Sequence, residues 1–204
     1  MTLRELLKRF ALGAAVGLTA TIMYHGTPYL GASRAIMRTS CWTWRIVPFN
    51  PLWFWPYISL FVLLGLPWFV LRTWSAVRAY AAALLAVAAV AWLTFVIYPT
   101  ACVRPSELYL PSYLSTFYLV DWPNNCFPCL HSAFAVYGGY VMCCRASYWD
   151  TPVPKVVIYS WVVAILVSIV ALRQHTGIDA VTGIGLGAIG IWLFRSLRSA
   201  DNAA

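Results

Sequence analysis

The sequence predicts an all-α fold: a polytopic membrane protein with six transmembrane helices and both termini in the cytoplasm. Three observations lead to this prediction. Hydrophobic residues make up 62% of the 204 residues, and charged residues only 10%, whereas a soluble domain carries about 25% charged residues. The apolar residues also gather in long uncharged stretches, which suit the hydrocarbon core of a bilayer. This composition excludes a soluble globule, a disordered chain and a small protein held together by disulfides.

Six uncharged stretches can each hold a helix that approaches the roughly 20 residues needed to cross a bilayer. They predict one membrane domain over residues 1–204, with spans at about 10–30, 50–71, 78–98, 129–146, 154–173 and 176–195. The last stretch is short and has to include Asp179. A further apolar segment, residues 108–120, is too short to span and predicts a partial helix in the membrane interface.

Lysine and arginine residues set the orientation, because cytoplasmic loops of membrane proteins carry an excess of them. With the N-terminus inside, nine basic residues fall on the cytoplasmic side and five outside, namely Arg34, Arg38, Arg45, Arg104 and Arg173. The net charge of +8 therefore reflects topology, and we expect membrane lipids and no nucleic acid as partners. We predict the inner membrane of a bacterium, with an extracytoplasmic active site; the oligomeric state stays open.

Polar residues at membrane depth are costly and therefore mark candidate functional sites. His131 begins the fourth span, and His175 begins the sixth, with Asp179 on the same helical face four residues later. Arg104 follows the third span, and Arg173 stands two residues before His175. In the predicted topology all five residues lie at the outer ends of helices, where they can meet at one depth.

This set of side chains is suited to phosphate chemistry. Two guanidinium groups offer forked donors to phosphoryl oxygens, and helix N-termini add backbone N–H donors. One imidazole can attack phosphorus while the second protonates the leaving oxygen. Six acidic residues are too few for a magnesium cage, and we expect neither a metal nor another cofactor. A structural interpretation stays open for each residue: a helix-end histidine, a polar pair between helices, or an arginine anchored at the membrane surface.

Three motifs resemble those of the type-two phosphatidic acid phosphatase superfamily. The string Tyr98-Pro-Thr-Ala-Cys-Val-Arg104-Pro105 is similar to the end of its K-x(6)-R-P motif. Phe127-Pro-Cys-Leu-His131-Ser132-Ala resembles its P-S-x-H motif, and Ser168-Ile-Val-Ala-Leu-Arg173-Gln-His175-Thr-Gly-Ile-Asp179 resembles S-R-x(5)-H-x(3)-D. The motifs follow the family's order and cover residues 98 to 179, whereas the first two spans carry none. The six-helix layout is also similar to that of the family.

The resemblance implies a role for each site residue. His175 is expected to be the nucleophile, Asp179 to orient it, and His131 to be the general acid. Arg104 is expected to bind the phosphate, and Arg173 to replace a second arginine.

The chain departs from the family pattern at three positions. The family's lysine is Ile97 here, its second arginine is Ile169, and the serine of P-S-x-H is Cys129. Cys129 and Ser168 join the two arginines as candidate phosphate-binding residues, although packing inside the bundle also explains both.

The resemblance implies a membrane-embedded lipid phosphatase or phosphotransferase that cleaves a lipid phosphate ester through a phosphohistidine. A phospholipid, a polyprenyl phosphate or a sphingolipid phosphate is the expected substrate. The Arg-Gln-His tripeptide looks more like inositol phosphorylceramide and sphingomyelin-synthase-like transferases, which pass a head group to a lipid or glycan acceptor. The lost cationic residues leave a third alternative, an inactive lipid-binding or transport protein. One disulfide among Cys41, Cys102, Cys126 and Cys129 stays open, without a choice of partners.

Overall fold

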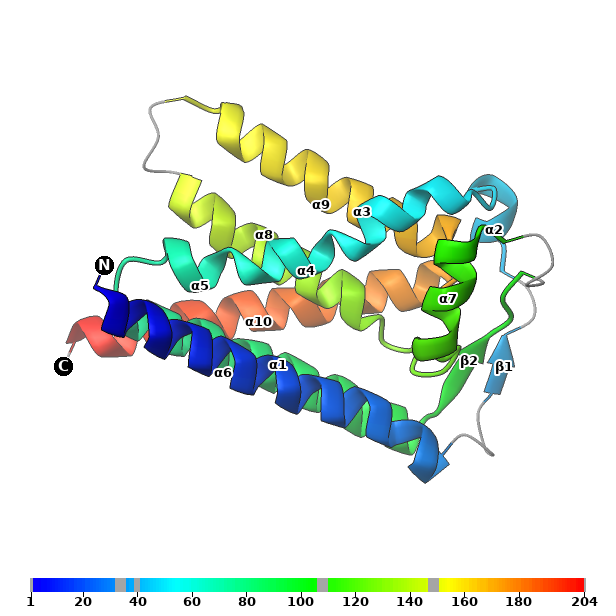
Figure 1. The fold of residues 1–204 in the computed structure, drawn as a ribbon, viewed down its shortest axis with the longest axis horizontal. Coiled ribbons are helices and arrows are strands. Elements are labelled where there is room, and N and C mark those ends of the chain that lie inside the picture. Colours follow the sequence, from blue (N-terminus) through cyan, green and yellow to red (C-terminus); the bar gives the residue numbers. More distant parts are fainter. Residues whose placement is uncertain (1, 32–35, 39–40, 106–109, 147–150, 204) are drawn as a thin grey trace.

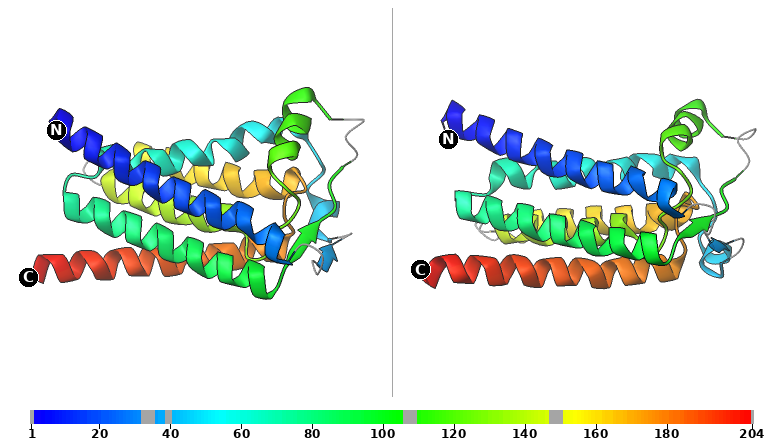
Figure 2. Two further views of the ribbon diagram at one scale, coloured as in Figure 1. Left: turned by 60° about the horizontal axis from the view of Figure 1, so that its bottom comes forward. Right: turned by 90° about the horizontal axis from the view of Figure 1, so that it is seen from below.

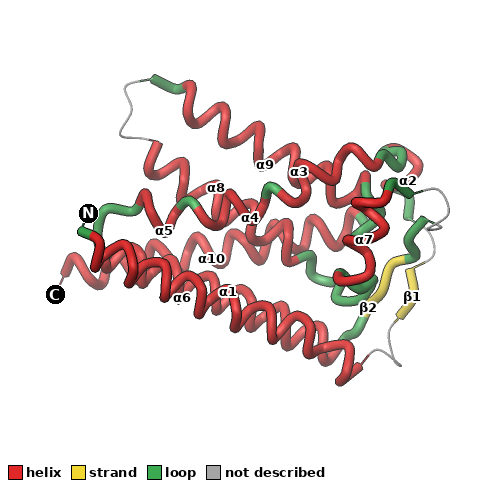
Figure 3. Tube along the Cα trace, viewed as in Figure 1, coloured by secondary structure: helices red, strands yellow, loops and turns green. Residues whose placement is uncertain are grey.

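The computed structural model describes residues 2–31, 36–38, 41–105, 110–146 and 151–203. This part of the chain is mostly helical, with only two short strands, which confirms the predicted all-α class (Figures 1 and 3). The long helices are α1 (Leu3–Gly31), α6 (Trp74–Ile97), α8 (Leu130–Ala146), α9 (Val153–Ala171) and α10 (Gly177–Ala203). The short elements are β1 (Ile36–Arg38), α2 (Thr43–Ile46), η2 (Pro51–Trp53), α3 (Phe54–Ile58), α4 (Leu60–Gly65), α5 (Pro67–Val70), β2 (Thr100–Cys102) and α7 (Ser112–Val120).

Five helical stretches in the described chain are long and apolar enough to cross a membrane. They are Leu3–Thr27, Pro51–Val70, Trp74–Ile97, Val153–Ala171 and Gly177–Ser199. Leu130–Cys144 is also an apolar helix, but it is shorter. Large apolar side chains on these helices, among them Phe10, Leu93, Val163 and Trp192, are exposed, as on a surface that faces lipid. The helices therefore fit an integral membrane protein.

The long helices lie side by side in one bundle, with both termini at the same end (Figures 1 and 2). The opposite end carries α2, α7 and the two strands, and we call it the loop end. β1 pairs in parallel with β2, so that Ile36 lies opposite Thr100. α7 falls within the partial helix predicted for residues 108–120, of which 108 and 109, like Arg34, lie outside the described residues.

The second predicted span is a chain of short helices instead of one continuous helix. It runs from Pro51 to Val70 through η2, α3, α4 and α5, with breaks at Ser59 and Leu66. Pro67 has no N–H group to donate to the preceding turn, which explains the second break. The hydroxyl of Tyr80 on α6 donates to the Leu64 carbonyl beside this break, at 2.9 Å, so a carbonyl group here is satisfied from another helix.

Arg9, near the start of α1, forms hydrogen bonds with the backbone at the end of α5. Its guanidinium is buried and donates to the carbonyl oxygens of Trp68 (3.1 Å), Leu71 (2.6 Å) and Arg72 (3.3 Å). These carbonyls belong to the last turn of a helix and to the residues after it, where intrahelical donors run out. The arginine therefore acts as a C-terminal cap supplied by a different helix.

We expect Arg9→Met to lower the free energy of unfolding by about 1–3 kcal/mol, since a buried helix end loses its charged donor. The melting temperature in detergent micelles measures this loss. Lys8→Met is the matched control, because Lys8 is the exposed neighbour on the same helix. Equal melting temperatures for the two variants would contradict the capping role.

Candidate active site

The structure brings His131 and His175 together at the loop end. His131 is the second residue of α8, and His175 lies in the short connection between α9 and α10. Their ring centroids are 6.2 Å apart, with an angle of 51° between the ring planes. The backbone joins the two segments directly, because the N–H of Cys129 donates to the carbonyl of Asp179 at 3.0 Å. Both imidazoles can therefore act on one small group.

His175 is held by the main chain. Its side chain is buried, and its Nδ1 lies 2.9 Å from the carbonyl oxygen of Cys126. A carbonyl only accepts, so Nδ1 carries the proton in the neutral ring and the lone pair is on Nε2. The Nε1–H of Trp44 in α2 donates to the backbone carbonyl of His175 at 3.2 Å. The resemblance assigned the orienting role to Asp179, but here the acceptor at Nδ1 is a backbone carbonyl.

Asp179 caps the N-terminus of α10 together with Thr176. Its Oδ2 accepts hydrogen bonds from both the N–H and the hydroxyl of Thr176, each at 2.7 Å, and Thr176 Oγ1 accepts from the Asp179 N–H at 3.5 Å. This reciprocal pair is a capping box. The N–H of Gly177 in the same turn donates to Thr43 Oγ1 at 3.1 Å. Three backbone N–H groups at this helix N-terminus, those of Thr176, Gly177 and Asp179, are thus bonded to protein groups.

The Cys129 thiol lies beside the His175 ring. It is fully buried, and its sulfur accepts from the N–H of Ser132 at 3.4 Å. Burial opposes the charged imidazolium, but the electrostatic interaction and hydrogen bond with the Cys129 side chain, with further contributions from Cys102 and Asp179, outweigh burial and raise the pKa of His175 to about 10. Cys129 is the largest contributor to this increase.

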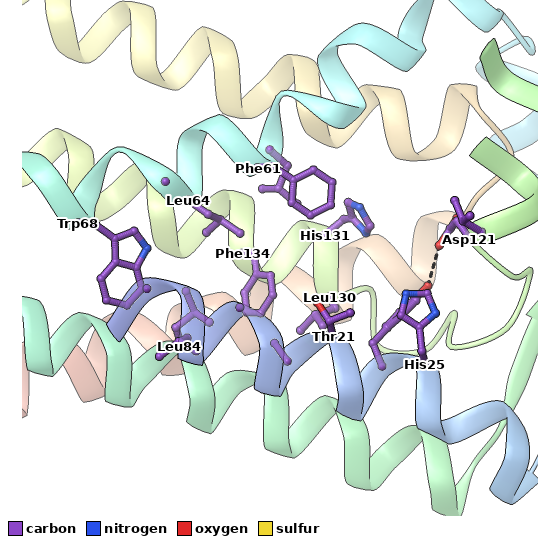
Figure 4. Close-up of a pocket in the computed structure, with 18 of the residues that line it drawn as sticks. Thr21, His25, Phe61, Leu64, Trp68, Leu84, Asp121, Leu130, His131 and Phe134 are labelled. Carbon is purple, nitrogen blue, oxygen red and sulfur yellow. Dashed lines mark hydrogen bonds between the residues drawn. The ribbon is translucent and has the colours of Figure 1, made fainter. Parts of the chain in front are cut away.

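His131 lies at the loop end of an apolar cavity between α1 and α4 (Figure 4). Tyr57 of α3 stacks on its ring, with centroids 4.3 Å apart and planes at 22°. The Tyr57 hydroxyl is 3.4 Å from His131 Nδ1. Asp121, which follows α7, lines the cavity at the same end. His131 therefore connects the histidine pair to a space large enough for a ligand.

Arg104 is bound to a carboxylate and an amide. Its Nη2 lies 2.8 Å from Asp121 Oδ2 and 2.6 Å from Gln174 Oε1, and its Nη1 donates to the backbone carbonyl of Asp121. The guanidinium also lies over the ring of Tyr118, 4.3 Å from its centroid. Gln174 directly precedes His175 in the chain, so Arg104 contacts the residue next to one of the two histidines.

The side chains of Arg173 and Ser168 bond to backbone carbonyls of Trp44 and Ile165. Arg173 has a positive φ of 58°, its Nη2 donates to the carbonyl of Trp44 at 2.9 Å, and its guanidinium lies 5.2 Å from the Trp44 ring centroid. Ser168 is fully buried in α9 and donates to the carbonyl of Ile165 at 2.6 Å. The phosphate-binding role predicted for these two residues stays a prediction, and the contacts seen are those of packing.

Sequence reasoning missed three residues that shape the site: Tyr57, Asp121 and Gln174. The chain has only six acidic residues, so Asp121 beside a predicted interfacial segment was a signal that could have been used. Gln174 was a weaker signal, as a polar residue between Arg173 and His175. Tyr57 belongs to a long apolar run, and no local pattern distinguishes it from its neighbours.

Compared with protein-family models, with curated proteins and with solved structures, the chain gives no match. Among the described residues, no group of three or more His, Cys, Asp or Glu side chains is placed to hold a metal ion. All six cysteines are free thiols. Interpretation of the site therefore depends on the residues and their geometry.

Proposed function

We propose that this protein is a membrane-embedded lipid phosphatase or phosphotransferase that works through a phosphohistidine on His175. The observation that carries the proposal is the pair of imidazoles, 6.2 Å apart, beside an apolar cavity. Attack needs about 3–3.5 Å between nitrogen and phosphorus, and proton donation to the leaving oxygen needs about 2.6–3.2 Å. Rings whose centroids lie 6.2 Å apart can reach the phosphorus and the leaving oxygen of one phosphate ester.

The reaction has two steps. Nε2 of His175 attacks phosphorus and forms a P–N bond, while the bond from phosphorus to the lipid oxygen breaks and His131 protonates that oxygen. His131, now neutral, takes a proton from water or an alcohol, which attacks phosphorus and breaks the P–N bond. The Cys126 carbonyl supports this chemistry because it fixes the His175 tautomer and stabilises the proton on Nδ1.

Arg104 is the cation best placed to bind the phosphate. Its guanidinium is paired with Asp121 and Gln174, and the latter is adjacent to His175. A phosphate can replace the Asp121 carboxylate as the hydrogen-bond acceptor of the Arg104 guanidinium. Binding therefore includes a partner exchange, which favours ligands that carry a full phosphate charge over neutral head groups.

The proposed active site faces the extracytoplasmic side. Both termini lie at the end opposite to the histidine pair, and that end carries the basic residues Arg4, Lys8, Arg195 and Arg198. The excess of lysine and arginine at that end supports a cytoplasmic location for it. In a bacterium the membrane would be the inner one.

Trapping the covalent intermediate tests this function. The purified protein is mixed with phosphatidic acid in detergent micelles, quenched in alkali and digested, and the peptides are analysed by mass spectrometry. We expect an alkali-stable, acid-labile phosphoryl group on the His175 peptide. Phosphate on no histidine, together with no product from a panel of lipid phosphates, would refute the proposal. Free phosphate identifies a phosphatase, whereas a phosphorylated added alcohol identifies the transferase alternative.

A lipid-binding or transport protein without catalysis is the second candidate. The observation in its favour is that both candidate arginines already have protein partners, Asp121 for Arg104 and Trp44 for Arg173. This candidate predicts lipid binding that is unaffected by loss of the nucleophile and no phosphohistidine at any lipid concentration.

We expect Cys129→Ser to shift the pH profile of kcat/KM. In the wild type the Cys129 side chain contributes most to the increase in the pKa of His175 to about 10, so the neutral nucleophile becomes abundant only as the pH rises. Serine keeps an acceptor for the Ser132 N–H but carries no charge, and the His175 pKa should fall. The rising limb of the profile should therefore move to lower pH. A limb at the same pH in both proteins would show that Cys129 does not control His175.

A further inference from the structure

The cavity between α1 and α4 has a volume of about 490 Å³, which is within the range of ligand pockets. It extends from His131 and Asp121 at the loop end to Trp68 near the other end of the bundle (Figure 4). On the α1 side its lining runs from Gly13 to His25. Across from α1 it is lined by apolar side chains, including Phe61, Leu64, Leu84 and Phe134.

The cavity is long and narrow. Twelve steps of an α-helix, from Gly13 to His25, give a length of about 18 Å and hence a mean cross-section of about 27 Å². Such a shape suits one extended hydrocarbon chain better than a bulky ring system. The charged and imidazole side chains of the lining lie at the loop end (His25, His131 and Asp121). The hydroxyl of Tyr24, another lining residue, donates to Asp121 at this end. Apart from Thr21, the remaining lining residues are apolar or glycine. The space therefore has the same division into head and tail as a lipid.

The cavity is also accessible from the side of the bundle. Phe61 lines it and is 60% exposed, and the lining residues Gly17 and Thr21 on α1 are exposed as well. A Cβ atom added to Gly17 would meet nothing within 4 Å. In a bilayer, the molecules next to this exposed apolar side are lipid chains.

We propose that this cavity binds one hydrocarbon chain of a membrane lipid, with the lipid head group at His131 and the chain end at Trp68. Arg104 pairs with Asp121 at the head-group end, so a guanidinium group lies beside the carboxylate that lines this part of the cavity. Trp68 closes the far end, where its ring lies 3.1 Å from the position of a Cβ on Gly13. This inference deepens the proposed function, since it assigns the lipid part of the substrate, but the binding itself requires no turnover.

Photocrosslinking with a phosphatidic acid that carries a diazirine at the end of one acyl chain tests the proposal. The full-length protein is reconstituted in phosphatidylcholine nanodiscs, irradiated and digested. We expect labelled peptides that contain Trp68 or Gly13. Labels confined to exterior residues such as Leu93 or Trp192 would overturn the proposal.

Two glycines on α1 provide the matched variants. Gly17→Leu should fill the cavity and abolish the crosslink, whereas Gly26→Leu should leave it intact, because Gly26 also has open space around its Cβ position but does not line the cavity. Thr21→Phe, another cavity-lining substitution, gives the same test if Gly17→Leu fails to fold. Undiminished labelling in a folded Gly17→Leu or Thr21→Phe protein would exclude this cavity as the binding site.

The binding proposal and the proposed function fail in different ways. Loss of the nucleophile in His175→Asn should leave the crosslink to the Trp68 region at the wild-type level. A crosslink without turnover on any lipid phosphate would refute the catalytic function and support the cavity. Turnover without a crosslink in the cavity would support the catalytic function and refute lipid binding in this cavity.

Discussion

Replacing His175 with alanine should abolish turnover, with a loss of about a thousandfold or more in kcat, because the P–N bond can no longer form. His131→Ala should lose about 10²–10⁴-fold with lipid phosphates, since the leaving oxygen departs without a proton. An aryl phosphate ester with an acidic leaving group needs no proton. It should therefore restore much of the rate of the His131 variant and none of the rate of the His175 variant.

His175→Asn separates a chemical role from a structural one. The asparagine amide can still donate to the Cys126 carbonyl, which His175 Nδ1 does at 2.9 Å, but it has no nucleophilic nitrogen. We expect this variant to melt close to the wild-type temperature in detergent and to be as inactive as His175→Ala. Activity in His175→Asn or in His175→Ala near the wild-type level would rule out the proposed nucleophile.

Gly183→Val should be the most destabilising of the glycine substitutions in α10, at about 3 kcal/mol or more. The Cβ atom would overlap the carbonyl oxygen of Cys129 and lie 2.8 Å from the Cβ of Ser132. Neither backbone nor a helical Cβ can rotate away, so α10 has to move away from α8. That movement also breaks the contact from the Cys129 N–H to the Asp179 carbonyl, which keeps the two histidines together.

Gly185→Val is the matched control for this prediction, because it puts the same side chain on the same helix where a Cβ meets nothing within 4 Å. Its melting temperature in detergent micelles should stay near that of the wild type. The Gly183 variant should melt far lower and lose activity. If both variants melt together, the close approach of α8 and α10 does not stabilise the fold.

Local sequence was a good guide to the helices and a weaker guide to their continuity. The uncharged stretches predicted helices at α6 and α9 that begin and end within a few residues of the observed ones. The stretch at residues 50–71 is also uncharged, yet it forms four short helices. Composition measures how apolar a segment is. It does not report whether partners such as Tyr80 will satisfy the carbonyls at a break, which decides whether the break is tolerated.

For the candidate site, too, the sequence predicted part of the arrangement and missed another part. Motif spacing indicated His131, His175 and Arg104 as residues of one site, and these residues do lie at one end of the bundle. The spacing gave no information about the direction of each side chain. Arg173 is two residues from His175, but its guanidinium packs on Trp44. Asp179 is at helical spacing from His175, but its Oδ2 caps α10 through Thr176.

The sequence by itself determined that this chain is a helical protein fit for a membrane, since hydrophobicity and charge act within segments of about 20 residues. It also indicated which polar side chains are candidates for a site. Only the tertiary structure decided what surrounds them: the Cys126 carbonyl at His175, Tyr57 on His131, and the long cavity beside them. The reason is that these contacts join residues 49 or 74 positions apart, and such pairs meet only when whole helices pack.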